Sequence, residues 1–177
     1  IVWTRDGTSP VLNPADEGTF TSYHVGYCSA LHEDNQFKLW YSAYDRDHGQ
    51  YHAFYAPSPD GTTFTREGLA LAAGSLGEPD VQYVLNPRVL PDGKSGYDMW
   101  YSGYSSVGYT VCYARGSDEK TFTPESVCLS PQYQDTYDAF NALIGSILPI
   151  DTGFRVYYGG TSMGSITTVN VAEIEVE

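Results

Sequence analysis

The residues Lys38–Tyr44, which read KLWYSAY, decide the fold of this protein because close copies of them recur. Asp98–Tyr104 reads DMWYSGY, and Arg155–Gly160 reads RVYYGG. A second block follows each of these in the same order: Tyr55-Ala56, Tyr113-Ala114 and Val171-Ala172. Several blocks in one order at a period of roughly 58 residues indicate a structural repeat. The chain therefore contains three copies of one supersecondary unit.

Each repeat has the pattern of four short strands separated by turn residues such as Asp92-Gly93. The predicted first strands are Thr21–Leu31, Val81–Leu90 and Asp138–Leu148, and the aromatic blocks form the second strands. The predicted third strands are Tyr51–Ala56, Tyr109–Arg115 and Ile166–Glu177, and the fourth are Phe64–Leu71 and Phe122–Leu129. The sequence thus predicts an all-β chain with almost no α-helix.

Both faces of the second strands carry large side chains. Leu39 and Tyr41 alternate with Trp40, so neither face of this strand is purely polar. A sheet that is apolar on both faces must lie between other sheets, as the stacked blades of a propeller do. We therefore expect a β-propeller built of three four-stranded antiparallel blades, with Trp40, Trp100 and Tyr157 in equivalent buried sites.

The repeat predicts how the ends of the chain combine. The third repeat stops after its third strand, whereas Trp3–Arg5 near the start resembles Phe64–Arg66 of a fourth strand. We therefore expect one propeller domain over 1–177, with repeats at 13–71, 72–129 and 130–177, closed by the N-terminal strand 1–12 beside the last strand. Propellers commonly have four to eight blades. Three blades leave open a two-chain ring of six, membership in a longer propeller, or closure alone.

Composition and charge exclude several partners. The net charge is −13, and the nine basic residues are scattered along the chain, which argues against nucleic acid or anionic lipid as a partner. The longest apolar run, residues 142–150, is too short to span a bilayer. The start at Ile1 without Met is typical of a mature chain, and low Lys with high Tyr favours an extracellular, secreted protein. No zinc-type spacing and no phosphate loop occur, so no metal or cofactor is expected.

The three cysteines leave the redox state open. Folding the predicted hairpin about Asp118-Glu119 places Cys112 opposite Glu125, three residues short of Cys128. A disulfide between Cys112 and Cys128 is therefore out of direct register. The alternative is that all three, Cys28 included, are thiols buried as small apolar residues.

Three motifs carry a family resemblance that covers nearly the whole chain. They are Asn86–Leu90 (NPRVL), Trp100–Gly103 (WYSG) and Tyr55–Gly61 (YAPSPDG). These motifs resemble the five-bladed β-propeller glycosidase-like superfamily, with blades of the arabinanase, fructosidase and mannoside-phosphorylase type. The resemblance implies a sugar site at the narrow mouth of the channel, with carboxylates on the innermost strands. The turn Ser58–Gly61 is similar to the Asp-box of sialidase propellers, which has a mainly structural role.

The chain departs from that family at its catalytic position. Where the family has an Asp directly before Pro, this sequence has Asn86 before Pro87. An amide is neither a general base nor a nucleophile at neutral pH, and glycoside hydrolysis needs two carboxyl groups about 5–10 Å apart. We therefore assign no catalytic residue and expect the family's hydrolytic activity to be absent.

The remaining polar residues near the starts of the innermost strands form the candidate ligand-binding set. Asp80 and Asp138 occupy equivalent repeat positions, which is also typical of a structural turn element, and Glu78 lies in a loop. His24 aligns with Tyr83 and Asn141, where a hydrogen-bonded rim residue is the alternative. The full set is His24, Glu78, Asp80, Asn86, Arg88, Asp138 and Asn141.

Three functions follow from this set. The first is a noncatalytic, secreted propeller that binds glycan, because Tyr and Trp faces with Asn, Asp and Arg suit sugar rings. The second is a self-associating structural protein, an oligomer or filament subunit, because strand edges and an incomplete ring favour association. The third is a glycoside hydrolase or phosphorylase that uses Asp80, Asp138 or Glu78.

Overall fold

A computed structural model describes residues 2, 10–14, 16–17, 20–75, 78–131, 138–162 and 167–175. These residues form strands and turns, and none of them lies in a helix. The prediction of an all-β chain is confirmed. Within these ranges no helix is long and apolar enough to span a bilayer.

Twelve described strands form one curled, propeller-like sheet made of three antiparallel parts. The first part contains β1 (Asp16–Glu17), β2 (Phe20–Glu33), β3 (Gln36–Asp45), β4 (Gln50–Ser58) and β5 (Gly68–Leu71). The second contains β6 (Tyr83–Pro91), β7 (Tyr97–Ser105), β8 (Gly108–Gly116) and β9 (Phe122–Leu129). The third contains β10 (Asn141–Ile150), β11 (Gly153–Thr161) and β12 (Thr167–Glu175). We call these parts the first, second and third sheets.

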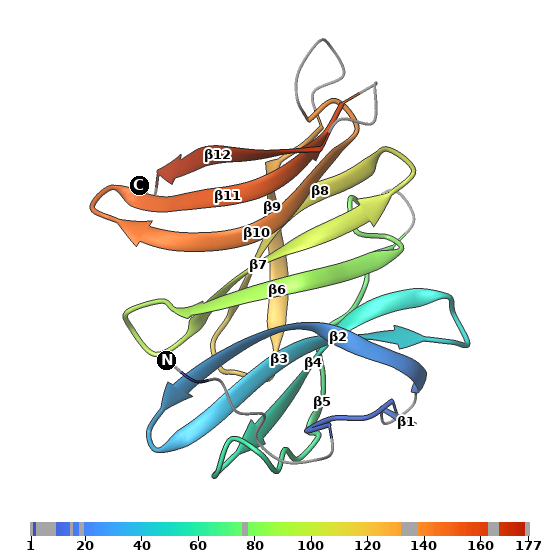
Figure 1. The fold of residues 1–177 in the computed structure, drawn as a ribbon, viewed down its shortest axis with the longest axis vertical. Helices are drawn as coiled ribbons and strands as arrows, with labels where there is room; N and C mark the ends of the chain where they lie inside the picture. The colour runs from blue at the N-terminus through green and yellow to red at the C-terminus, as the bar shows by residue number, and fades with distance from the viewer. Residues whose placement is uncertain are drawn as a thin grey trace.

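Single parallel pairs join the three sheets. Tyr51 of β4 pairs with Tyr83 of β6, and Tyr109 of β8 pairs with Asn141 of β10. The strands β2, β6 and β10 consequently run in the same direction, and the sheets lie one above another (Figure 1). These three are the innermost strands of the repeat pattern, and their starts lie at one end of the molecule.

The aromatic blocks pack between sheets. Trp40 of the first sheet is 0% exposed and packs with Met99 and Tyr101 of the second. Its indole Nε1 donates to the carbonyl of Glu119, 2.8 Å away. Trp100 repeats the arrangement between the second and third sheets, against Ile147 and other apolar side chains. β7 thus lies between two apolar interiors, which explains its two apolar faces. The second face of β3, with Leu39 and Tyr41, is covered by Leu12, Val25 and Phe64 and not by another sheet.

The third aromatic block breaks the pattern. Tyr157 occupies the same position in its sheet as Trp40 and Trp100. Each of the three pairs with the repeat-equivalent residue of the following strand. Its side chain is nevertheless 36% exposed, because within the described residues no further sheet covers this face. The prediction that Tyr157 is buried is therefore wrong. The exposed residues Leu148, Tyr157, Val169 and Val171 are called the open face below.

The N-terminal stretch lies against the first sheet as far as the structure describes it. Leu12 packs against a cluster that contains Tyr41 and Phe54, and Arg66 donates to the carbonyl of Asn13. Most of the predicted closing strand, residues 3–9, falls outside the described residues. Within the described ranges β12 pairs with β11 alone, so closure by residues 1–12 stays a prediction.

The Asp-box-like turn of Ser58–Gly61 is built by its own side chains. The carboxylate of Asp60 accepts the backbone N–H groups of Thr63 at 2.7 Å and Thr62 at 2.8 Å. These two bonds lower the pKa of Asp60 well below its ordinary value, and the bond from Thr63 has the larger effect. Asp118 makes the same bonds in the next repeat, to the N–H groups of Lys120 and Thr121. The motif therefore shapes the turn, as the sequence predicted.

All three cysteines are free thiols. Two register shifts in the β8–β9 hairpin place Cys112 opposite Val127, so the predicted pairing of Cys112 with Glu125 is wrong by two residues. The alternative of three buried thiols holds for Cys112 only, since Cys28 is exposed and Cys128 half-buried. Burial raises the pKa of Cys112 to about 11, which keeps that thiol protonated at neutral pH.

Candidate functional site

Each innermost strand carries an irregularity near its middle. The register shifts between Gly26 and Ser29 in β2, between Leu85 and Arg88 in β6, and between Ile144 and Ser146 in β10. A bulge bends its strand and re-aims the side chains at that point. We call the region where these three bulges meet the inner seam.

Two residues of the inner seam adopt the left-handed backbone region. Tyr27 has φ 52° and Asn86 has φ 53°, and they occupy equivalent positions in successive repeats. Asn tolerates this conformation, whereas a bulky Tyr pays roughly 1–3 kcal/mol for it. Backbone strain of this kind is concentrated at functional sites. The two bulges therefore mark the seam as the leading candidate for a binding site.

Polar side chains of β6 reach across the seam to its neighbours. Arg88 donates from Nε to the carbonyl of Gly145 at 2.8 Å and from Nη1 to that of Cys28 at 3.3 Å. The amide of Asn86 contacts the carbonyl of Ile144 at 3.5 Å. Two predicted site residues, Asn86 and Arg88, are thus brought together at the same bulge of β10. Arg88 touches all three innermost strands.

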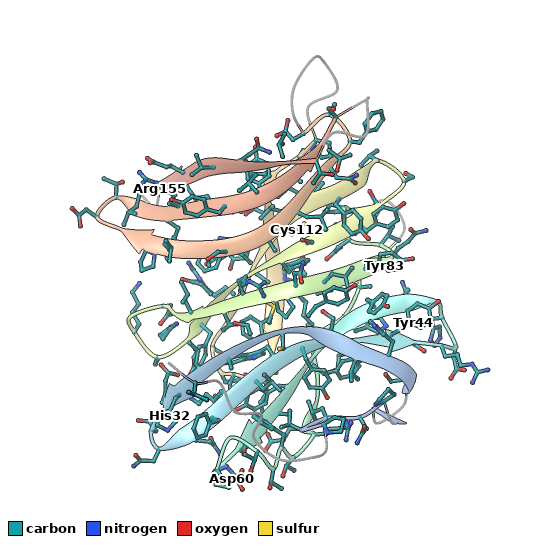
Figure 2. All side chains as sticks on the ribbon, viewed as in Figure 1. His32, Tyr44, Asp60, Tyr83, Cys112 and Arg155 are labelled. Atoms are coloured by element: carbon teal, nitrogen blue, oxygen red, sulfur yellow. The ribbon has the colours of Figure 1, made fainter. Side chains whose placement is uncertain are left out.

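Seven rings extend from the seam to the ends of the first two sheets, and we call them the aromatic rim. The centroids of Tyr51 and Tyr83 are 5.3 Å apart, and those of Tyr83 and Tyr104 are 5.1 Å apart in a stacked pair. Figure 2 shows Tyr44 and Tyr83 at the same end of their sheets, opposite His32 and Arg155. The rim consists of His24, Tyr27, Tyr44, Tyr51, Tyr83, Tyr104 and Tyr109.

His24 belongs to this rim. Its Nδ1 lies 2.9 Å from the hydroxyl of Tyr51, and its ring packs edge-on against Tyr27 and Tyr51. Tyr27 itself is 47% exposed and directly precedes Cys28, whose carbonyl binds Arg88. Tyr27 therefore connects the rim with the inner seam. Its ring offers an accessible aromatic face of the kind on which sugar rings stack.

Asp80 and Asp138 hold the tyrosines of the second strands. The hydroxyl of Tyr101 donates to Asp80 at 2.7 Å, and that of Tyr158 donates to Asp138 at 2.8 Å. Burial and then the Asp138 contacts raise the pKa of Tyr158 to about 12. Burial also raises the pKa of Asp80, although the Tyr101 bond opposes the shift. Each carboxylate thus makes a structural contact, which agrees with the presence of Asp at the same position in two repeats.

The two remaining predicted residues lie apart from the seam's polar contacts. Asn141 accepts the backbone N–H of Tyr109 at 3.1 Å, which ties β10 to β8. Glu78 is exposed in the loop before β6, where it lines a cavity of about 540 Å³ with Gln82 and Ser105. A ligand-binding role for either residue stays a prediction.

Carboxylates are scarce on the innermost strands. Phe20–Glu33 contains a single one, Glu33 at its far end, which accepts from the hydroxyl of Tyr97 at 2.9 Å. Tyr83–Pro91 and Asn141–Ile150 contain none. Among the described residues no group of three or more His, Cys, Asp or Glu is arranged to hold a metal ion.

Sequence reasoning missed Tyr27 and the continuity of the rim. The signal for Tyr27 was its position in the repeat, one period before Asn86. The strained backbone conformation that the two share is visible only in the structure. The rim arises because hairpin ends from two repeats meet, which no single motif encodes.

Comparison with solved structures identifies the fold. A family 117 glycoside hydrolase from the marine bacterium Zobellia galactanivorans matches with a TM-score of 0.66 at 16% identity, covering 88% of this chain and 52% of that protein. A protein of the GH130 family of mannoside phosphorylases matches with a TM-score of 0.69 at 17% identity, covering 94% and 57%. The protein BT0996, in a complex with RGII, matches with a TM-score of 0.68 at 16% identity, covering 91% and 55%.

The chain has the fold of glycosidase-like propellers, and the resemblance predicted from its motifs is confirmed. It spans little more than half the length of these proteins. No protein-family model and no curated protein matches the sequence. At this level of identity the likeness shows the fold, and function must be argued from the site.

Proposed function

We propose that this chain is a secreted, noncatalytic β-propeller module that binds glycan at the inner seam. The observation that carries the proposal is the meeting of Asn86 and Arg88 at the bulge of β10, where Arg88 also binds the carbonyl of Cys28, the residue after the exposed Tyr27. Amide and guanidinium groups bind sugar hydroxyls, and an aromatic face covers the apolar side of a sugar ring. The likeness to glycoside hydrolases supports a carbohydrate as the ligand class.

The lack of catalysis follows from the same strands. Hydrolysis requires two carboxyl groups about 5–10 Å apart on either side of the bond. β6 and β10 carry none, and the nearby Asp80 and Asp138 are bonded to Tyr101 and Tyr158. The module therefore binds without turnover. In this proposal the three sheets are three propeller blades, and residues 1–12 complete the third.

The test combines binding and activity. Calorimetry on arabinan, fructan and mannoside oligosaccharides should detect binding that Tyr27→Ala weakens about tenfold, as expected from loss of a stacking ring. Tyr157→Ala is the matched control, because this tyrosine is similarly exposed but lies on the open face. Turnover that disappears in Asp80→Asn or Asp138→Asn would replace this proposal with a glycoside hydrolase or phosphorylase.

Self-association is a second candidate function, and the open face favours it. On β12, the side chain of Val169 is 83% exposed and that of Val171 is 56% exposed. The equivalent positions one repeat earlier, on β8, carry side chains that pack against β10. An uncovered apolar sheet face is a site of association. Sedimentation velocity should then show oligomers that Val171→Asp dissociates and that Val107→Asp, an exposed valine in the turn after β7, leaves intact. A monomer at all concentrations would remove this candidate.

A further inference from the structure

The guanidinium of Arg88 is a half-buried cation, and its hydrogen-bond partners among the described residues are all neutral. Nε binds the carbonyl of Gly145, and Nη1 binds the carbonyls of Cys28 and Pro87, the latter at 3.0 Å. The Nη2 group makes no hydrogen bond to the described residues. Arginine carries five N–H donors in a rigid fork. One edge of this fork therefore has no partner among the residues that the structure describes.

Four other basic side chains of the described ranges have acidic partners. Arg155 pairs with Glu173, Lys120 with Glu67, Lys38 with Glu33, and Arg115 lies 3.6 Å from Asp98. Arg88 has no ion pair within the described residues, although acidic residues outnumber basic ones by 22 to 9 in the chain. Burial lowers the pKa of Arg88, which shows that its position disfavours the charge it carries. An anion at the seam would offset that cost.

The groups beside Arg88 fit a sugar better than a bare ion. Asn86 contacts the carbonyl of Ile144, the residue before Gly145, so both side chains bind the same bulge of β10. Tyr27, one residue before Cys28, supplies an exposed aromatic ring. A cation can pair with an acidic substituent, an amide can bind sugar hydroxyls, and an aromatic ring can cover the apolar face of a sugar.

We propose that the inner seam binds a sugar that carries a carboxylate, a uronic acid unit, and that Arg88 pairs with this carboxylate. The inference rests on the proposed glycan binding and adds the charge of the ligand. A charge-assisted hydrogen bond from guanidinium to carboxylate is stronger than one to a neutral hydroxyl. We expect the acid form of a sugar to bind about tenfold to a hundredfold more tightly than its uncharged ester.

The first test changes the ligand and leaves the protein intact. Calorimetry would compare oligosaccharides of galacturonic, glucuronic and mannuronic acid with their methyl esters, which lack the charge. Acid forms should bind more tightly, and the difference should shrink as salt screens the pair. Equal affinity for acid and ester would overturn this inference while leaving glycan binding standing. Absence of binding to every acid, ester and neutral sugar would overturn both proposals.

The second test changes the cation. Arg88→Gln should abolish the preference for acid over ester, and Arg88→Lys should keep part of it, because Lys retains charge without the fork. Arg115→Gln is the matched control, since it removes the same charge from an exposed side chain paired with Asp98. An unchanged acid preference in folded Arg88→Gln would overturn the inference. Inorganic phosphate that binds more tightly than any uronate would assign the seam to phosphate instead, and would also overturn it.

Discussion

The hydroxyl of Tyr101 donates a 2.7 Å hydrogen bond to Asp80, and both side chains are buried between the first two sheets. Asp80 precedes β6 in the chain, whereas Tyr101 lies in β7. The bond therefore fixes the loop that leads into an innermost strand of the seam. Tyr158 and Asp138 form the same bond one repeat later, with a half-buried carboxylate.

The first prediction concerns removal of this donor. Tyr101→Phe should lower the free energy of unfolding by about 2 kcal/mol, because it leaves a buried carboxylate without its hydroxyl partner. Tyr158→Phe should cost less, since water reaches Asp138 more easily. Urea denaturation of both variants measures the difference. Equal losses in the two variants would contradict the burial argument.

The second prediction concerns pH. Burial raises the pKa of Asp80 above its ordinary 3.8, so the folded protein holds this proton to higher pH than the unfolded chain does. The wild type therefore loses stability as the pH rises from the unfolded pKa through the folded one, and the loss persists above it. Asp80→Asn has no such proton. Its stability relative to the wild type should rise in urea titrations as the pH increases from the unfolded pKa of Asp80 through its raised folded pKa; a flat or falling difference would refute the assignment.

The third prediction compares two repeat-equivalent aromatic residues. Trp40→Ala should cost about 3–5 kcal/mol, because it empties a packed site between two sheets. Tyr157→Ala should change the free energy of unfolding by less than about 1 kcal/mol, because its side chain is 36% exposed. Chemical denaturation of the monomer at low concentration measures both. A comparable loss at Tyr157 would mean that another sheet covers the open face in solution.

The fourth prediction concerns the position of Asn86. Asn86→Asp should produce no hydrolysis of furanosides or mannosides, because β6 and β10 carry no second carboxylate. The new carboxylate would lie beside Arg88 and compete for its guanidinium. Binding of uronic acid oligosaccharides should therefore weaken by about tenfold or more. Reducing-sugar assays and calorimetry on the same preparation check both outcomes, and turnover by the variant would contradict the first.

The sequence predicted much of the fold because the repeat constrains it from several sides. The aromatic blocks, the turn residues and the two-sided apolar strands all placed the strands correctly, with ends that differ by a few residues. The prediction that Tyr157 is buried was wrong because its sequence pattern matches that of Trp40 while its environment does not. Burial depends on the sheet that packs against a residue, which the repeat period cannot reveal. The predicted partner of Cys112 in the β8–β9 hairpin was wrong because two register shifts move the strands relative to each other.

The candidate site was less predictable than the strands. Repeat alignment placed Asp80 and Asp138 among the ligand-binding candidates with a structural turn as the alternative, and each carboxylate accepts a bond from a tyrosine hydroxyl. The family resemblance identified Asn86 and Arg88 as separate candidates, but their approach to one bulge of β10 depends on the curvature of the whole sheet. The acceptors of Arg88 are backbone carbonyls, which every residue carries and no sequence pattern marks.

The single parallel pairs that join the sheets have a consequence for how such molecules change in evolution. Neighbouring sheets share one pair, Tyr51 with Tyr83 or Tyr109 with Asn141, so nearly every backbone hydrogen bond is internal to a repeat. A gene duplication or deletion of one whole repeat would leave the ladders of the others intact. The number of stacked sheets then depends on the side-chain packing between neighbours, and it can differ between molecules built from the same repeat.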